Sequence, residues 1–129
     1  EFGATTGRSR RCGWLDIPAL RYSIMINGIS EIALTKLDVL GVFDELKICT
    51  GYSLDGKSLK SFPADAQTLS RVQCDYITLP GWNCSLDGIM SFDALPKAAQ
   101  DYVRMIEQLL ETKITWVSTS PAREDTFAL

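Results

Sequence analysis

The sequence contains no histidine, and its four cysteines include no Cys-x-x-Cys pair. These absences argue against a zinc centre built from histidine and cysteine. They also exclude an imidazole side chain of this chain as a general base. Widely spaced thiols are typical of proteins in a reducing compartment, so we expect free cysteines and a cytoplasmic protein.

Long apolar runs are missing as well. No segment approaches the roughly 20 apolar residues that cross a bilayer, and no basic-then-apolar leader is present. The Gly-x-x-x-x-Gly-Lys-Ser/Thr phosphate loop is also absent. The net charge of -3 disfavours a nucleic-acid-binding protein, because such proteins usually carry a basic excess. We therefore expect neither a membrane nor a nucleic acid as partner.

What is present is an ordinary globular composition. The 129 residues are 46% hydrophobic and 22% charged, which is enough for one domain with its own core. We expect residues 1–129 to be a single domain or part of one. The chain starts at Glu1 without methionine and opens directly in a binding-type loop. Glu1-Phe2 could be a cloning remnant, but a fragment of a longer protein is the favoured interpretation.

Hydrophobic periodicity and turn residues predict alternating helices and strands. Asp16 is the expected N-cap of the first helix, and Asn27-Gly28 its end. The expected elements are helices over 15–28 and 96–112, strands over 31–35, 72–79 and 114–117, a hairpin of 45–52 with 58–62, and a loop over 118–125. This order predicts an α/β fold, a mixed sheet with flanking helices, whose binding loops follow strands.

The first fourteen residues combine glycines and hydroxyls with three arginines, Arg8, Arg10 and Arg11. Glycine lets a backbone approach its ligand closely. The guanidinium fork binds carboxylate or phosphate through two hydrogen bonds. The stretch therefore predicts a loop for small anions. The alternative is an exposed basic loop whose arginines pair with surface carboxylates.

Two further segments, Thr35–Asp38 and Ser118–Pro121, directly follow apolar strands. Asp38 could accept hydrogen bonds from the ring N–H and exocyclic amine of guanine, whereas adenine offers no such pair. The segment Ser118–Pro121 could form a second wall of the same pocket. The alternatives are an exposed Lys-x-Asp and a plain turn. Trp82 and Trp116 are expected to be core or loop anchors.

Four segments together resemble the C-terminal portion of the adenylosuccinate synthetase family. They are Gly3–Asp16, Leu34–Leu40, Leu79–Trp82 and Ser118–Thr126. The resemblance implies part of a GTP-dependent ligase of purine nucleotide biosynthesis. Such an enzyme joins IMP and L-aspartate through 6-phosphoryl-IMP, releasing GDP and phosphate. It also implies Mg, a cytoplasmic homodimer, and an α/β fold related to P-loop guanine-nucleotide proteins.

The resemblance assigns two sets of site residues. The set for aspartate and IMP is Ala4, Thr5, Thr6, Gly7, Arg8, Ser9 and Arg10. The set for GTP is Arg10, Lys36, Leu37, Asp38, Ser118, Thr119 and Ser120. It places no catalytic residue and no metal ligand in this chain, because the family's catalytic aspartate and histidine, phosphate loop and metal ligands belong to an N-terminal portion absent here. We therefore expect the chain to be inactive alone.

Two residues depart from the family pattern. Ser120 stands where glycine is usual, and we expect it to crowd the guanine or shift the loop. Gly41 replaces a common acidic residue, and we expect a looser turn there. Two other functions stay open: a non-catalytic guanine-nucleotide-binding module, and an RNA-binding protein that uses Arg8, Arg10 and Arg11, which the acidic net charge disfavours.

Overall fold

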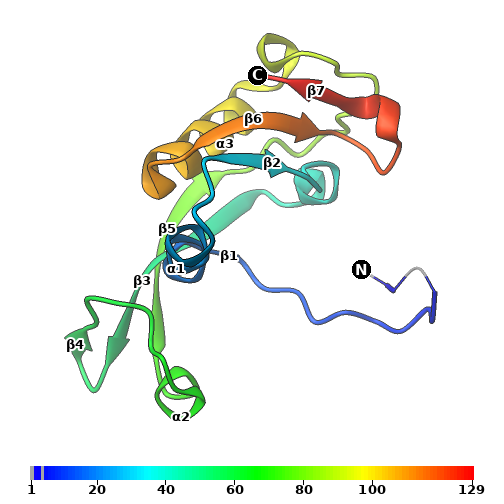
Figure 1. Ribbon diagram of the computed structural model, residues 1–129. Coiled ribbons are helices and arrows are strands. Elements are labelled where there is room, and N and C mark those ends of the chain that lie inside the picture. Colours follow the sequence, from blue (N-terminus) through cyan, green and yellow to red (C-terminus); the bar gives the residue numbers. More distant parts are fainter. Residues whose placement is uncertain (1, 4) are drawn as a thin grey trace.

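The computed structural model describes residues 2–3 and 5–129, and its strands form two mixed sheets (Figure 1). The first sheet has the order β1-β3-β4, and β5 also pairs with β3. Its strands are β1 (Leu15–Asp16), β3 (Glu45–Leu54), β4 (Lys57–Ser58) and β5 (Gln73–Pro80). The second sheet has the order β2-β6-β7. Its strands are β2 (Glu31–Leu34), β6 (Lys113–Ser118) and β7 (Thr126–Ala128).

Helices lie between these strands along the chain. They are α1 (Ile17–Asn27), α2 (Ala66–Leu69) and α3 (Lys97–Leu110), with short 3-10 helices at Asp38–Val42, Phe92–Ala94 and Arg123–Asp125. The predicted α/β class is confirmed. The single mixed sheet is divided in two, since β2 and β6 pair with each other and not with β3.

The first helix has the predicted caps. The Asp16 side chain accepts a hydrogen bond from the Ala19 amide at 3.1 Å. Gly28 ends the helix with φ of 61°, a conformation that glycine adopts without steric cost. The helix is shorter than predicted at its start, because Leu15 and Asp16 pair with β3 in a parallel bridge.

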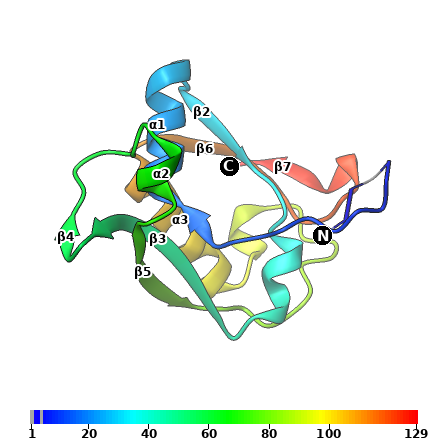
Figure 2. The ribbon, with the colours of Figure 1, turned by 90° about the horizontal axis from the view of Figure 1, so that it is seen from below.

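The long amphipathic helix α3 packs against both sheets, and together they form one core (Figures 1 and 2). Its buried face consists of Ala99, Tyr102, Val103, Ile106 and Leu110. Leu46 and Ile48 of β3 belong to the same cluster as Ile114 and Val117 of β6. Because the cluster is continuous, the second sheet is held firmly against the rest of the molecule.

The carboxyl end of α3 is fixed to α1 by Arg21. Its Nε donates to the Leu109 carbonyl at 2.7 Å, and its guanidinium lies 3.3 Å from the Glu111 carboxylate. A cation at this end complements the helix dipole.

The strands differ from the sequence prediction in pairing. The predicted hairpin exists, but β4 has only two residues. The main antiparallel partner of β3 is β5, from Glu45 opposite Pro80 to Ser53 opposite Gln73. The strand β7 was not predicted.

The burial of Trp82 and the free cysteines agree with the sequence predictions, whereas the exposure of Trp116 does not. Trp82 is 8% exposed, as expected of an anchor, whereas Trp116 in β6 is 48% exposed, so the core assignment was wrong for it. All four cysteines are free, as predicted. Within the described part of the chain, no helix combines the length and apolar character that a membrane crossing requires.

Candidate functional site

The two segments predicted to contact guanine leave the second sheet at one edge. Strands β2 and β6 are parallel, and Leu34 lies opposite Val117. The segments that follow, 35–38 and 118–120, therefore start side by side at the carboxyl ends of adjacent strands. Ligands of α/β sheets commonly bind at such an edge.

At this edge Asp38 opens a 3-10 helix, directly after the buried Leu37, which is 1% exposed. Lys36 has a φ of 68°, a left-handed conformation that is uncommon for a residue with a side chain. Oδ1 of Asp38 is buried and has no hydrogen-bond partner among the described residues. Such an oxygen is costly to leave unpaired, and it is free to accept a hydrogen bond from a donor outside the described residues.

The neighbouring loop, residues 118–125, is organised by Thr119. Thr119 is 0% exposed. Its amide donates to the Asp125 carbonyl at 3.0 Å, and its hydroxyl lies 3.1 Å from the Ile89 carbonyl and 3.2 Å from that of Asp125. The Ser118 hydroxyl donates to the Ser120 carbonyl at 2.7 Å. Both hydroxyls therefore shape the loop from within.

Ser120 also points into its own loop. Its hydroxyl is hydrogen-bonded to the Asp125 carboxylate, and it accepts from the Ala122 amide at 2.9 Å. The side chain expected to crowd a base thus has partners within the loop.

The expected looser turn at Gly41 is not what the structure shows. A Cβ placed on Gly41 would lie 2.5 Å from the Cys84 carbonyl oxygen, closer than side-chain carbons approach backbone. A Cβ on Gly81 would lie 1.9 Å from the Phe43 carbonyl oxygen. The 3-10 helix that begins at Asp38 is therefore packed tightly against the segment around Trp82, which supports it from behind.

The N-terminal arm, residues 2–13, has a different construction. The Gly3 amide donates to the Arg8 carbonyl at 2.8 Å, and the Gly7 amide donates to the Gly3 carbonyl at 2.9 Å. A bridge joins Phe2 to Ser9, and Gly7 has a φ of 62°, which favours glycine at this turn. Ala4, a predicted contact of aspartate, lies outside the described residues.

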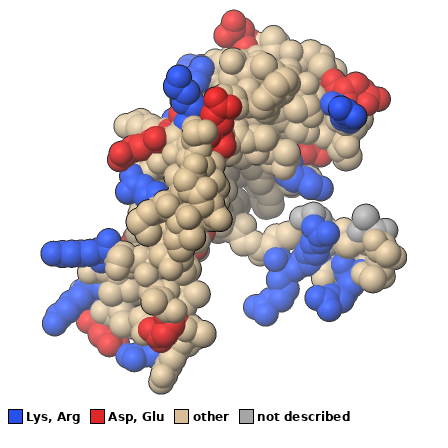
Figure 3. Space-filling model, in the orientation of Figure 1, with Lys and Arg blue, Asp and Glu red and all other residues tan. Residues whose placement is uncertain are grey.

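The arm projects from the start of β1 (Figure 1) and carries its cationic groups in the open (Figure 3). Arg8, Ser9, Arg10 and Arg11 line an open hollow. Within residues 2–3 and 5–129, neither Arg8 nor Arg11 forms an ion pair. For these two arginines the alternative of pairing with surface carboxylates is not what the structure shows.

The base of the arm lies beside the other candidate segments. The Trp14 ring packs edge-on against Phe43, with centroids 5.4 Å apart. Phe43 ends the 3-10 helix that Asp38 begins. The arm is thus anchored next to the 3-10 helix that Asp38 begins. Contact of Arg10 with the GTP phosphates stays a prediction.

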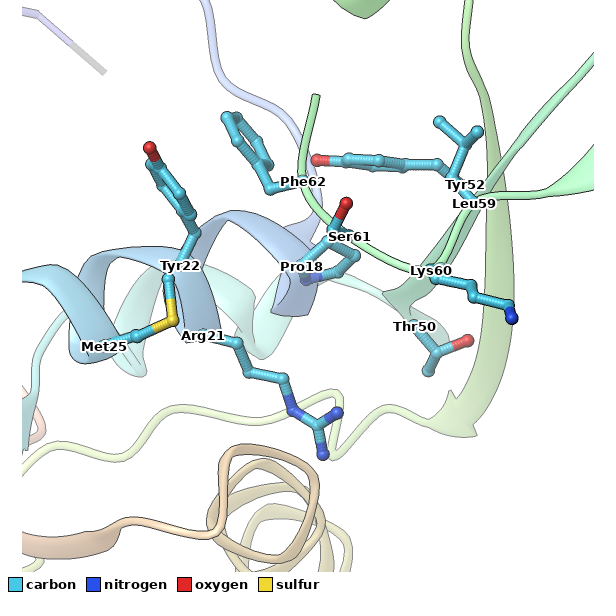
Figure 4. Close-up of a pocket in the computed structure, with 11 residues that line it drawn as sticks. Pro18, Arg21, Tyr22, Met25, Thr50, Tyr52, Leu59, Lys60, Ser61 and Phe62 are labelled. Carbon is cyan, nitrogen blue, oxygen red and sulfur yellow. The ribbon is translucent and has the colours of Figure 1, made fainter. Parts of the chain in front are cut away.

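A separate hollow of 360 Å³ lies between α1 and the β3–β4 hairpin (Figure 4). Tyr22 stacks on Phe62 there, with ring centroids 5.1 Å apart. Arg21, on its wall, is bonded to the Leu109 carbonyl of α3. None of the predicted site residues lines this hollow.

Two buried side chains with ionisable protons, Cys49 and Tyr52, are not suited to act as nucleophiles. Burial, with Cys74 and Asp16 adding to it, raises the pKa of the Cys49 thiol to about 12. Burial and the hydrogen bond to Asp16 raise the pKa of Tyr52 above its usual value. Both groups stay protonated at neutral pH, so neither acts as a nucleophile.

Among the described residues, no group of three or more acidic, cysteine or histidine side chains could hold a metal ion.

Comparisons with known proteins identify the family. The sequence model of adenylosuccinate synthetase matches residues 1–127. The chain belongs to the adenylosuccinate synthetase family.

Its relatives in that family are close. The adenylosuccinate synthetase of Pelodictyon phaeoclathratiforme is 56% identical over 126 residues, which are 98% of this chain and 29% of that protein. The Kluyveromyces lactis enzyme is 52% identical over 124 residues, 96% of this chain and 29% of that protein. This chain therefore spans less than a third of its relatives' length.

The fold matches too. The structure of fully ligated adenylosuccinate synthetase from Plasmodium falciparum superposes with a TM-score of 0.95 at 37% identity. The match covers 100% of this chain and 31% of that one.

Sequence reasoning missed two residues that shape the candidate site. Asp125 accepts bonds from both Thr119 and Ser120, yet the sequence indicated only that it lies in the 118–125 loop. The tight packing of Gly81 against Phe43 was not predicted either. The Pro-Gly pair before Trp82 indicated only a turn.

Proposed function

We propose that this chain supplies the guanine pocket and the aspartate loop of an adenylosuccinate synthetase. The complete enzyme would join IMP and L-aspartate at the expense of GTP, giving adenylosuccinate, GDP and phosphate. The observation that carries the proposal is the buried, unpartnered Oδ1 of Asp38 at the strand edge shared with the 118–125 loop. Membership of the family supplies the reaction class.

Guanine would complete the Asp38 site. Its ring N–H and exocyclic amine both donate, and a carboxylate accepts both. Adenine has an acceptor nitrogen, not an N–H, beside its exocyclic amine, so it cannot donate to both carboxylate oxygens and would be disfavoured. Lys36 would lie with its stem along the base, and Ser118, Thr119 and Ser120 would form the opposite wall.

The arm would bind L-aspartate. Arg8 and Arg10 are exposed and cationic, and a guanidinium pairs with a carboxylate in bidentate geometry. Thr5, Thr6, Gly7 and Ser9 would contribute hydroxyls and amides around the same ligand. Arg8 would also contact IMP, and Arg10 the GTP phosphates. These positive charges would reduce the repulsion between anionic aspartate and phosphorylated IMP.

In the reaction, the GTP γ-phosphoryl group would pass to O6 of IMP, giving 6-phosphoryl-IMP and GDP. The amine of aspartate would then attack C6, and phosphate would leave. This chain has no histidine to move the proton. The described residues also do not fit a Mg²⁺ site. We therefore assign this chain to binding and charge neutralisation, and place acid–base and metal chemistry in the part of the family's chain that it does not span.

On the basis of family membership, we propose three further properties. The complete protein is a homodimer, it is cytoplasmic, and residues 1–129 form one domain or part of one. The second candidate function is a non-catalytic guanine-nucleotide-binding module. It would use the same Asp38 site, because that site lies within this chain. The two functions differ in whether product forms when the rest of a family member is supplied.

A chimera tests the proposal. This chain would replace the matching 126 residues of the Pelodictyon phaeoclathratiforme enzyme, to which it is 56% identical. We expect adenylosuccinate from IMP, GTP and aspartate, with the unaltered relative as control. Arg8→Ala should raise the KM for aspartate about tenfold or more, because hydrogen bonds to charged groups contribute roughly 1.5–3 kcal/mol. Arg11→Ala is the matched control. A folded chimera that binds GTP without forming product would favour the module.

A further inference from the structure

We propose that Ser120 is a positioning residue for the nucleotide: its hydroxyl holds the 118–125 loop in the shape that receives the base. The inference rests on the proposed guanine pocket. It concerns a side chain that departs from the family pattern, since Ser120 stands where the family usually has glycine.

The geometry fixes the direction of both bonds at Ser120. A hydroxyl has one proton and two lone pairs. The carboxylate of Asp125 can only accept, so the Ser120 hydroxyl donates to it. The lone pairs remain for the Ala122 amide, 2.9 Å away. The bond to the carboxylate is charge-assisted and therefore stronger than a neutral one.

These bonds join residues 120, 122 and 125, in a part of the loop that has few backbone hydrogen bonds of its own. The two ends already meet, where Thr119 donates to the Asp125 carbonyl at 3.0 Å. Between them, the Asp125 amide makes a longer bond to the Ala122 carbonyl, at 3.2 Å. The Ser120 hydroxyl joins both of these residues through a single side chain.

The consequence concerns binding more than folding. Thr119 is fixed by the core and keeps the loop attached whatever Ser120 does. Without the hydroxyl, residues 120–124 would open locally, and a nucleotide would have to order them again on binding. A loop ordered in advance avoids that loss of affinity.

The test uses this chain with Ser120→Ala, which keeps the backbone preferences but removes both bonds. The rescue variant is Ser120→Thr, which restores a hydroxyl. GTP affinity is measured by isothermal titration, with ATP in parallel. Exchange of the Ala122 amide hydrogen is followed by NMR without nucleotide. Thermal unfolding reports whether the fold is altered.

We expect Ser120→Ala to weaken GTP binding about three- to tenfold, because the nucleotide would have to order the loop again on binding. Exchange at Ala122 should be roughly fivefold or more faster, the unfolding midpoint should be unchanged, and Ser120→Thr should restore affinity and protection.

Three other outcomes overturn the inference. If the parent chain prefers GTP but Ser120→Ala binds it equally well, Ser120 has no positioning role and the proposed pocket stands. A lower unfolding midpoint with unchanged affinity shows a structural role only. If the parent chain shows no preference for GTP over ATP, the proposed pocket fails together with the inference.

Discussion

The N-terminal arm and the carboxyl edge of β2 and β6 both hold predicted binding residues, but their surroundings are opposite. The arm is exposed and is joined to the body by Trp14 against Phe43. At the strand edge, Leu37 and Thr119 are buried, and Asp38 presents one oxygen with no partner among the described residues. Reading a base requires acceptors already in place, whereas arginines can bind a carboxylate from an exposed loop.

The largest effect on stability is expected at the carboxyl end of β2. Leu37→Ala removes a fully buried side chain next to Asp38 and should lower the free energy of unfolding by about 2–5 kcal/mol. Val42→Ala, at the end of the 3-10 helix that follows Leu37 but at a residue 75% exposed, is the matched control and should change it by less than about 0.5 kcal/mol. Urea unfolding measures both. Equal effects would mean that this helix is not packed as described.

Alkaline pH should weaken the core that supports the strand edge. Burial raises the pKa of Tyr102 from 10.0 to about 12, and its ring lies edge-on to Trp82. The unfolded chain loses this proton first, so the contribution to stability is complete below pH 10 and is lost as pH rises to 12. Its size is roughly 3 kcal/mol at most.

The control for this pH effect is Tyr102→Phe, which keeps the ring and removes the ionisable hydroxyl. Unfolding in urea at pH values from 9 to 12 should show a smaller loss of stability for this variant than for the parent. The buried Cys49 thiol is present in both proteins, so the difference belongs to Tyr102. Identical losses would contradict the assigned cause.

Two threonines allow a closer comparison of the regions. Thr119→Val removes a buried hydroxyl that lies near two carbonyl oxygens, and should cost about 1–3 kcal/mol. Thr5→Val makes the same change in the exposed arm and should cost less than about 0.5 kcal/mol. Thermal unfolding of both variants gives the comparison. A tolerated Thr119→Val would mean that the loop depends on other contacts.

The smallest effect on stability is expected in the arm. Arg11→Ala should leave the free energy of unfolding within about 0.5 kcal/mol of the parent, because its guanidinium forms no ion pair among the described residues. Limited trypsin digestion, followed by mass spectrometry, should cut first after Arg8, Arg10 or Arg11. Earlier cleavage within α3 would contradict the exposed placement of the arm.

The regular elements could be predicted because each is specified locally. Asp16 and Gly28 mark the two ends of α1, and the spacing of apolar residues along α3 predicts its buried face. Pairing between distant strands has no such local signal. The partnership of β3 with β5, and the separation of β2 and β6 into a second sheet, depend on long-range packing.

The candidate site divides in the same way. The residue types of Asp38 and Arg8 are enough to indicate acceptor chemistry and anion-binding chemistry, because each follows from the side chain itself. The unpartnered Oδ1 of Asp38 and the bonds of Ser120 to Asp125 and Ala122 depend on backbone conformation, which the sequence did not reveal.

The role of Asp38 in the guanine pocket is tested most directly by the base preference of the Asp38→Asn variant. Binding of GTP, ATP and XTP to the parent chain and to this variant would be measured by titration. If Asp38 reads the base, the parent prefers GTP and the variant shifts toward XTP, because an amide can donate to the carbonyl that xanthine has in place of the guanine amine. An unchanged preference for GTP in the variant would contradict the placement of Asp38 at the base.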